Sequence, residues 1–231
     1  MSARRGKAVL ALLLLVPPAS LGVASGMVYF PGRPLGTVLF AACKVWLFGL
    51  PLIWRLFVER QAVSLSPARN GGFGMGVLTG LLISAVILAA YALVGGRRLD
   101  RALLADKMAA VGLASPGLYL AGAAYWILVN SVLEEYVWRW FCVRQCEQLL
   151  ARVPAVALSA LFFTLHHVVA LRVYMAPGPV LVCAAGIFIG GAIWSWMYTR
   201  YRSIWPGYVS HAIVDVSVFG LGAWMLFGPA P

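Results

Sequence analysis

Two adjacent carboxylates lie inside a long apolar stretch of this chain. Glu134 and Glu135 belong to the sequence S-V-L-E-E-Y-V-W-R-W-F, which also holds Arg139 and lies in an apolar run long enough to cross a bilayer. Each charged side chain at a membrane centre costs roughly 2.5 to 3.5 kcal/mol even on lenient insertion scales. Their retention at that depth indicates a functional role, which depends on the groups they face.

The spacing of these three residues separates their roles. Glu135 and Arg139 are four residues apart, so they can pair on one face of a helix. Successive helical residues are turned by about 100°, so Glu134 and Glu135 are expected to face different neighbours. Glu134 then has no partner on its own helix, which makes it a candidate general base. The structural alternative is an ion pair within the helix plus a carboxylate bonded to a neighbouring helix.

All three histidines of the chain lie in two later apolar runs. His166 and His167 end the sequence S-A-L-F-F-T-L-H-H, and the helical turn between them should let at most one point directly toward Glu134. His211 and Asp215 lie four residues apart in the last run, which begins Y-V-S-H-A-I-V-D. An isolated intramembrane histidine is often only an interhelical hydrogen-bond partner. The concentration of histidines and acids in three spans nevertheless predicts one shared polar site.

Composition places these residues in an integral membrane protein. The 231 residues are 62% hydrophobic and only 11% charged, with a mean hydropathy of +0.89, which lies outside the range of soluble domains. The net charge of +11 comes from basic residues that mostly flank apolar runs, so it indicates membrane topology and not nucleic-acid binding. The four cysteines show no pairing pattern and are interpreted as small hydrophobic residues.

The apolar runs predict an all-α, polytopic membrane protein with about seven transmembrane helices and one amphipathic interfacial helix. About 20 residues at 1.5 Å per residue cross a hydrocarbon core roughly 30 Å thick. The predicted spans are 8–30, 35–58, 72–94, 118–141 with a possible helical extension to 148, 155–174, 180–198 and 204–227. The sequence has no detectable repeat or low-complexity linker, so residues 1–231 are expected to form a single integral membrane domain.

Local features refine this outline. The first run resembles a secretory signal but is longer than a typical one, so it is interpreted as an uncleaved helix bent by Pro17 and Pro18. The third run is rich in glycine, which suits close helix packing in lipid. Residues 95–115 alternate apolar and charged residues near helical spacing, which predicts an amphipathic connector on the membrane surface.

The basic residues predict a cytoplasmic N-terminus. With that orientation eleven fall on or toward the cytoplasmic side, namely Arg4, Arg5, Lys7, Arg55, Arg60, Arg69, Arg139, Arg144, Arg152, Arg200 and Arg202. Six fall on the other side, namely Arg33, Arg97, Arg98, Arg101, Lys107 and Arg172. The positive-inside rule favours this orientation, although the cluster 97–107 opposes it. The expected location is an inner or plasma membrane.

Three motifs, in order, resemble those of the CPBP family of intramembrane proteases. E-E-Y-V-W-R is similar to the family's EExxxR motif, F-T-L-H-H to its FxxxH motif, and H-A-I-V-D to its third motif, HxxxN or HxxxD. The segment W-S-W-M-Y-T-R-Y-R-S-I-W-P-G-Y-V-S-H resembles the usual approach to the third motif. The resemblance covers about residues 130–217 within a family-like core of about 116–228, whereas the first half matches only in being membrane helices.

This resemblance implies an intramembrane endopeptidase with assigned residues. Glu134 and the histidine of the second motif would activate a water molecule for attack on a peptide carbonyl. That histidine is His167 if the motif begins at Phe163, whereas His166 fits from Phe162. His167 is preferred because the family pattern usually ends on a histidine followed by an apolar residue. Glu135 and Arg139 would brace the first helix as supporting residues.

The third motif implies an oxyanion-stabilising role for His211 together with residue 215. An asparagine at that position could donate a hydrogen bond to an oxyanion, whereas an ionised Asp215 can only accept one. Asp215 therefore either orients His211, as an outer carboxylate fixes an imidazole, or itself carries a proton.

Other proteolytic chemistries lack their sequence requirements. The chain has no G-x-S-x-G and no H-E-x-x-H, and Asp215 is the only aspartate within a span, so an aspartyl pair is excluded. Zinc is the remaining alternative, because Glu134, His167, His211 and Asp215 can all bind it. A glutamate-type mechanism without metal or other cofactor is the preferred prediction.

A proton-coupled transporter or a non-catalytic membrane scaffold is the main rival, because intramembrane acids and histidines also form proton relays. The absence of a repeated half argues against a transporter. Lys44, halfway along the second run, is predicted to pair with Glu134, Glu135 or Asp215. The expected partner is a membrane-anchored or lipidated protein or peptide in the bilayer. A prenylated C-terminus, a leader peptide and a C-terminal sorting anchor all remain open.

Overall fold

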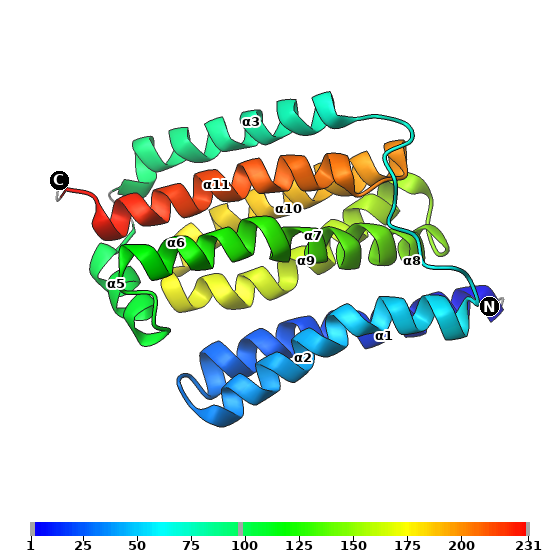
Figure 1. Cartoon of the computed structure of the whole chain (residues 1–231), viewed down its shortest axis with the longest axis horizontal. Coiled ribbons are helices and arrows are strands. Elements are labelled where there is room, and N and C mark those ends of the chain that lie inside the picture. Colours follow the sequence, from blue (N-terminus) through cyan, green and yellow to red (C-terminus); the bar gives the residue numbers. More distant parts are fainter. Residues whose placement is uncertain (1–2, 97–98, 230–231) are drawn as a thin grey trace.

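A computed structural model describes residues 3–96 and 99–229 as a bundle of helices (Figure 1). The helices are α1 (Ala3–Ala24), α2 (Pro34–Ile53), α3 (Phe73–Ala90), α5 (Arg101–Ala110), α6 (Pro116–Tyr125), α7 (Ser131–Glu134), α8 (Arg144–Glu147), α9 (Arg152–Tyr174), α10 (Pro177–Tyr201) and α11 (Trp205–Phe227). Five π-helical segments continue them, η1 (Ser25–Tyr29), η2 (Trp54–Val58), η3 (Tyr91–Gly95), η4 (Trp126–Asn130) and η5 (Glu135–Val143). These described residues contain no strand.

The prediction of an all-α protein with seven spans is confirmed. Among the described residues, seven helical stretches are long and apolar enough to cross a membrane. They are Ala3–Tyr29, Pro34–Val58, Phe73–Leu93, Pro116–Glu147, Arg152–Tyr174, Pro177–Tyr201 and Trp205–Phe227. The fourth stretch continues to Glu147, so the predicted helical extension beyond Phe141 is also present.

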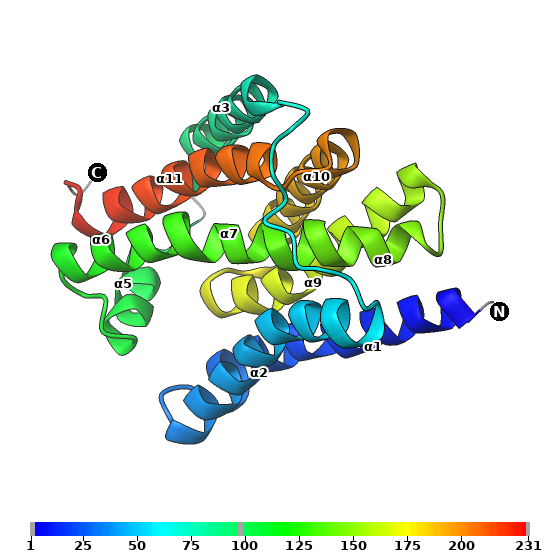
Figure 2. The ribbon, with the colours of Figure 1, turned by 45° about the vertical axis from the view of Figure 1, so that its right-hand side comes forward.

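The stretch from α6 to α8 runs through the centre of the bundle. The α1–α2 hairpin lies along one side, where α1 packs against α9, and α3 covers α11 on the opposite side (Figures 1 and 2). α9 and α10 pack against each other and against η5. The polar motifs of η5, α9 and α11 are therefore held between two apolar outer layers.

The two prolines of the first span are accommodated within a continuous helix. Pro18 has no N–H, so the carbonyl of Leu14 lacks its usual partner four residues later. The indole nitrogen of Trp46 on α2 donates to that carbonyl at 2.8 Å. A residue of the hairpin partner thus satisfies the group that the proline leaves unpaired, and α1 continues to Ala24.

Small residues allow α3 to pack closely on α11. Gly76, Gly80 and Ser84 are buried and spaced four apart on one face of α3. A Cβ added at Gly80 would lie 2.9 Å from Ile213 and 3.0 Å from the Ser210 carbonyl oxygen. The predicted use of glycine for close packing is confirmed at these positions.

The connector between α3 and α6 is a shorter helix than predicted. α5 begins after Asp100, whose carboxylate accepts a hydrogen bond from the Leu103 amide. It ends at Ala110 and not near Ser115, because Gly112 has a left-handed backbone with φ of +80°. Arg97 and Arg98, counted in the predicted amphipathic segment, lie outside the described residues.

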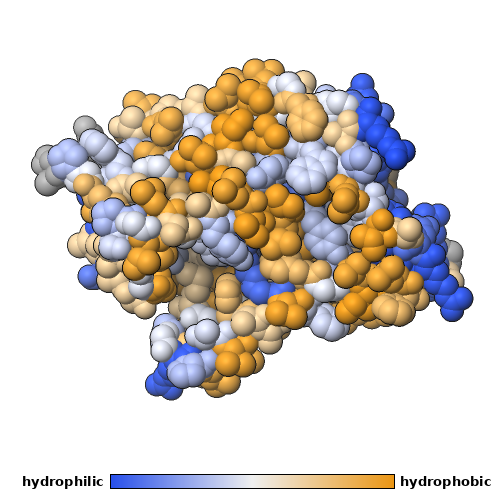
Figure 3. Space-filling view, in the orientation of Figure 1, coloured by the Kyte–Doolittle hydropathy of each residue, from blue (hydrophilic) through white to orange (hydrophobic). Residues whose placement is uncertain are grey.

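On the face seen in Figure 3, apolar atoms cover much of the middle, and the most hydrophilic atoms gather at the right-hand end. Many large apolar side chains are exposed, among them Val45 and Phe57, each 73% exposed. An exposed apolar belt of this extent indicates a lipid-facing surface. The integral membrane assignment is therefore confirmed by the fold, whereas the assignment of residues 1–231 to one domain stays a prediction.

Candidate active site

The central helix changes its winding where the first motif lies. Residues Glu135–Val143 form a nine-residue π-helical segment, and all of them except Tyr136 are buried. A π-helix bonds residue i to i+5, and such segments are rare and frequent at functional sites. Glu134 is the last residue before this segment, so the two glutamates lie at a junction between two helical windings.

Glu134 is buried, with 8% of its surface exposed, and has a partner on its own helix. The Asn130 side-chain amide donates to Glu134 Oε1 at 2.9 Å, and the Lys44 ammonium donates to Asn130 Oδ1 at 2.8 Å. The expectation that Glu134 has no partner on its helix is wrong, because the neutral amide of Asn130, four residues earlier, bonds to it. The predicted carboxylate partner of Lys44 is also corrected, since its hydrogen-bond partner is the neutral Asn130.

Lys44 is held among aromatic rings as well as by this bond. Its ammonium lies 4.9 Å from the ring centre of Trp126 and 5.2 Å from that of Phe48. Such cation–π contacts compensate part of the lost hydration of a charge. The Lys44–Asn130–Glu134 chain therefore brings a positive charge near the glutamate without a direct ion pair.

Glu135 joins the predicted ion pair to a histidine of another span. Its Oε1 lies 3.4 Å from Arg139 Nε and 3.1 Å from His211 Nδ1, and both glutamate and arginine are fully buried. His211 Nε2 lies 3.8 Å from Glu134 Oε2. The expectation that the two glutamates face different neighbours is therefore wrong, because one imidazole presents its two nitrogens to both.

Aromatic rings position the arginine and this histidine. The guanidinium carbon of Arg139 lies 4.4 Å from the ring centre of Phe163 and 5.3 Å from that of Trp194. Trp194 stacks on His211, with ring centres 4.0 Å apart and an interplanar angle of 17°. The Trp194 indole donates to the Ser210 hydroxyl at 2.9 Å. His211 is thus fixed by a stacked ring and by Glu135.

Both histidines of α9 lie beside Glu134. Glu134, His166 and His167 each offer one ligand atom, and these three atoms lie within 4.8 Å of one another. The expectation that only one histidine can point toward Glu134 is therefore wrong. His167 Nδ1 donates to the Phe163 carbonyl at 2.9 Å, which leaves Nε2 with a lone pair. His166 instead stacks on Trp138, with ring centres 5.2 Å apart.

Asp215 contacts the central helix through a hydroxyl. Ser131 Oγ donates to Asp215 Oδ2 at 2.6 Å. His211 Nε2 lies 3.8 Å from the same oxygen, which is too long for a hydrogen bond. Glu135 is therefore the carboxylate that hydrogen-bonds His211, through Nδ1. Glu134 and Asp215 both lie 3.8 Å from the other ring nitrogen, Nε2.

The motif helices match a known family model. Residues 116–217 match the family model described as type II CAAX prenyl endopeptidase Rce1-like. Over these residues the chain is similar to the CPBP family of proteases. No curated protein and no solved structure matches the chain. The CPBP match begins at Pro116, where α6 begins, and ends two residues after Asp215, so it includes all three motifs and none of α1 to α5.

The residues that cluster around Glu134 differ from the zinc ligands expected from the sequence. Zinc ligands lie about 2.0 to 2.2 Å from the metal in a tetrahedral arrangement. The three clustered groups are Glu134, His166 and His167, whereas the set considered from the sequence used His211 and Asp215 with only one histidine of α9. Two imidazoles and a carboxylate are a suitable donor set for catalytic zinc, so these three residues would hold it.

Sequence reasoning missed several neutral residues of the CPBP site. Asn130 lies four residues before Glu134, a spacing that could have identified it. Ser131 and Trp194 act across helices, and no spacing within one helix indicates their contacts.

Proposed function

We propose that this protein is an intramembrane endopeptidase that hydrolyses a peptide bond of a membrane-associated protein substrate. One observation carries the proposal. A buried carboxylate, Glu134, lies with two imidazoles inside a bundle whose core matches a CAAX-type endopeptidase family. A general base must lie within reach of the water that it activates, and the side chains of His166 and His167 define such a place beside Glu134.

The proposed chemistry is a hydrolysis in which Glu134 moves protons. Glu134 removes a proton from a water molecule held with His167 Nε2, and the water oxygen bonds to the carbonyl carbon of the substrate. The carbon–nitrogen bond then breaks, and Glu134 returns the proton to the leaving amine. The acid and amine products together contain the atoms of the peptide and one water.

His211 is proposed to stabilise the tetrahedral oxyanion. When both ring nitrogens are protonated, Nδ1 donates to Glu135 at 3.1 Å and Nε2–H is available to the oxyanion. The Glu135–Arg139 pair and the Trp194 stack hold the ring in this orientation. Oriented donors of this kind stabilise developing charge because they do not need to reorganise during the reaction. Asp215 is proposed to hold Ser131 and the α11 backbone beside this site.

The surroundings support a substrate that reaches the site from the bilayer. Glu134 lies 13 residues before the end of the fourth span, about 20 Å along the helix axis. We propose that the substrate is a membrane-anchored or lipidated protein and that the enzyme works in an inner or plasma membrane with its N-terminus in the cytoplasm. A transporter or scaffold is less favoured, because the matched family is one of proteases.

The decisive experiment compares two single-carboxylate variants in cells. Membrane proteins are searched by mass spectrometry for uncleaved termini in cells with wild-type protein, Glu134→Gln or Asp106→Asn. Asp106 is exposed on α5, so its variant removes one carboxylate away from the site. Loss of a general base lowers the rate by about 10²- to 10⁴-fold, so Glu134→Gln should leave substrates uncleaved while Asp106→Asn cleaves normally. Normal cleavage by Glu134→Gln would overturn the enzymatic proposal.

A further inference from the structure

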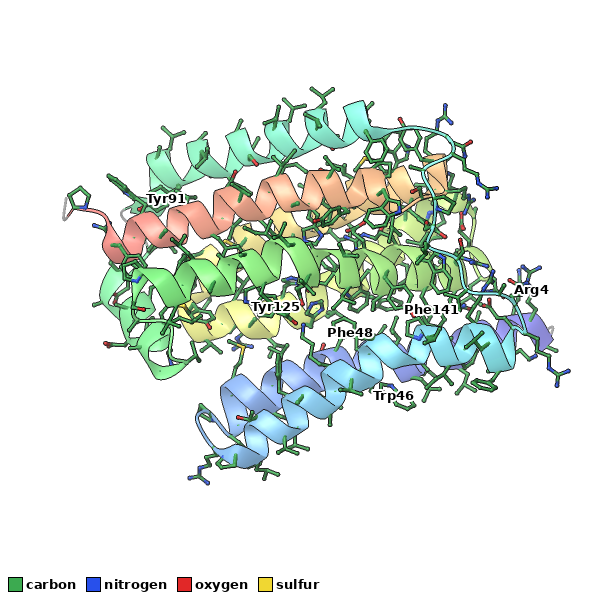
Figure 4. The ribbon with its side chains drawn as sticks, in the orientation of Figure 1. Arg4, Trp46, Phe48, Tyr91, Tyr125 and Phe141 are labelled. Atoms are coloured by element: carbon green, nitrogen blue, oxygen red, sulfur yellow. The ribbon has the colours of Figure 1, made fainter. Side chains whose placement is uncertain are left out.

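A basic cavity lies at the end of the bundle that carries the N-terminus. It has a volume of about 780 Å³ and is lined by residues from α1, η2, the connection before α3, the central helix and the turn between α10 and α11. Figure 4 places Arg4 at this end, far from Tyr91, and Figure 3 shows hydrophilic atoms gathered there. Six arginines line it, namely Arg4, Arg5, Arg55, Arg69, Arg144 and Arg202.

Carboxylates neutralise only some of these arginines. Glu147 binds Arg202 through two hydrogen bonds of 2.6 and 2.9 Å. Glu59 lies 2.8 Å from Arg55 and 4.0 Å from Arg144. Glu59 and Glu147 therefore pair with three of the six arginines, namely Arg55, Arg144 and Arg202.

The other three arginines lack an acidic partner. Within residues 3–96 and 99–229, no carboxylate lies within 4.0 Å of the guanidinium groups of Arg4, Arg5 or Arg69. The Arg4 side chain donates to the neutral Gln148 amide oxygen at 3.2 Å. The cavity therefore has an excess of positive charge that the carboxylates of these residues do not neutralise.

The wall of the cavity is fixed by specific backbone contacts. The Ser203 hydroxyl donates to the Ser66 carbonyl at 2.7 Å, and the Ser66 hydroxyl accepts from the Ile204 amide at 3.1 Å. The Asn70 amide donates to the Tyr201 carbonyl at 3.1 Å. Arg202 has a left-handed backbone with φ of +53°, which a non-glycine residue adopts at a cost. The connection before α3 is thus tied to the turn that follows α10.

The cavity is separate from the proposed active site. Trp140 and Arg144 line the cavity and lie six and ten residues after Glu134, about 9 and 15 Å along the same helix. Glu134 itself does not line it. The basic groups are thus too distant to take part in the proposed hydrolysis.

We propose that this cavity binds the phosphate of an anionic phospholipid headgroup. It lies where the seven spans end, which is the depth of the bilayer phosphates. Guanidinium groups bind phosphate oxygens in a forked geometry, and basic pockets between membrane helices bind lipid headgroups. Exposed apolar side chains border the connection, with Phe57 73% and Leu65 82% exposed, and these provide a surface for acyl chains. A soluble phosphate would make no use of that surface.

The test uses full-length protein in detergent and measures retained lipid by native mass spectrometry. Phosphatidylglycerol and phosphatidylcholine are titrated against wild type and against Arg5→Gln/Arg69→Gln. The control is Arg33→Gln/Arg172→Gln, which removes the same charge from exposed positions at the opposite end of the spans. The Arg5/Arg69 pair variant should lose about thirtyfold in phosphatidylglycerol affinity, equivalent to ~1 kcal/mol per arginine. The control and phosphatidylcholine binding should change little.

Three results of the lipid titration alone would overturn the proposal, and a fourth needs a cleavage measurement beside it. The three are equal retention of the two lipids by wild type, equal loss in both pair variants, and displacement of phosphatidylglycerol by millimolar inorganic phosphate, which would assign the site to a soluble anion. Unchanged lipid retention with slower cleavage of acidic substrates would assign the arginines to a protein substrate instead. Lipid retention is measured without substrate turnover, so the outcome of the lipid titration does not depend on the proposed hydrolysis. Thermal unfolding of each variant verifies that it is folded.

Discussion

At the residue scale, the two neighbouring histidines of α9 differ in their surroundings. His167 donates through Nδ1 to the Phe163 carbonyl and keeps Nε2 available, whereas His166 lies flat against Trp138. His167→Phe should therefore lower kcat by about a hundredfold, because the attacking water loses the group that positions it. His166→Phe keeps an aromatic ring against Trp138 and should have a smaller effect. Turnover of a membrane-anchored peptide in liposomes measures both variants.

The opposite ranking of the two variants would assign the second motif to Phe162 and His166. Equal, complete losses would instead indicate that both imidazoles hold the same group. The second outcome would favour zinc, for which Glu134, His166 and His167 supply three ligands.

Chelation tests directly whether the proposed hydrolysis requires a bound metal. Because the proposed proton transfers use Glu134 alone as the base, activity should be unchanged after strong chelation and removal of the chelator. The measurement is peptide turnover with metal content determined on the same sample. Activity that disappears on chelation and returns only with zinc would replace the glutamate-type mechanism with a metal-dependent one.

At the scale of elements, α11 approaches the central helix through a glycine. A Cβ at Gly207 would lie 2.5 Å from Glu135 Oε2, whereas a Cβ at Gly220 on the same helix meets no atom within 4 Å. Gly207→Ala should therefore destabilise the protein by about 1 to 3 kcal/mol through overpacking. It should also lower activity, because Glu135 must move away from His211. Gly220→Ala should change neither property.

Thermal unfolding in detergent and peptide turnover separate these effects. A Gly207→Ala variant as stable and active as Gly220→Ala would mean that Glu135 has freedom to move and does not fix His211. That result would remove the orienting role proposed for the Glu135–Arg139 pair.

The elements were largely predictable from sequence, whereas the contacts between them were not. Apolar runs define helices because lipid requires every backbone group to be bonded within the helix. The Glu135–Arg139 pair followed from its spacing. The shared contact of both glutamates with His211 depends on how α11 is rotated toward the central helix, which no periodicity in the sequence indicated. Neutral partners such as Asn130 were not predicted, because the pattern of charged residues does not reveal neutral hydrogen-bond donors.

At the scale of the whole molecule, the distribution of arginines predicts how the bundle lies in its membrane. The basic cavity gathers arginines from α1, η2, the central helix and the end of α10 at one end of the spans. The positive-inside rule therefore predicts that this end faces the cytoplasm. In a variant with its four native cysteines replaced, Arg33→Cys should react with an impermeant thiol reagent added outside intact cells. Arg69→Cys should react only after the cells are opened.

Labelling of Arg69→Cys in intact cells would reverse the proposed orientation. The lipid proposal would then concern the outer leaflet, because the cavity and the phosphate region stay at the same end of the spans. The hydrolytic proposal would be unaffected in its chemistry, but its substrates would approach from the other side.

The π-helical winding of Glu135–Val143 affects where its side chains point. A π segment can be read as an α-helix that has gained a residue without changing its neighbours, so removing one residue there would restore ordinary hydrogen bonding. The shortened helix would be more regular, and the residues on either side would keep their orientation, so only the side chains inside the segment would be re-aimed. The wider winding therefore aims the side chains between Glu135 and Val143, Arg139 among them, at neighbours that the same residues in a regular helix would not face.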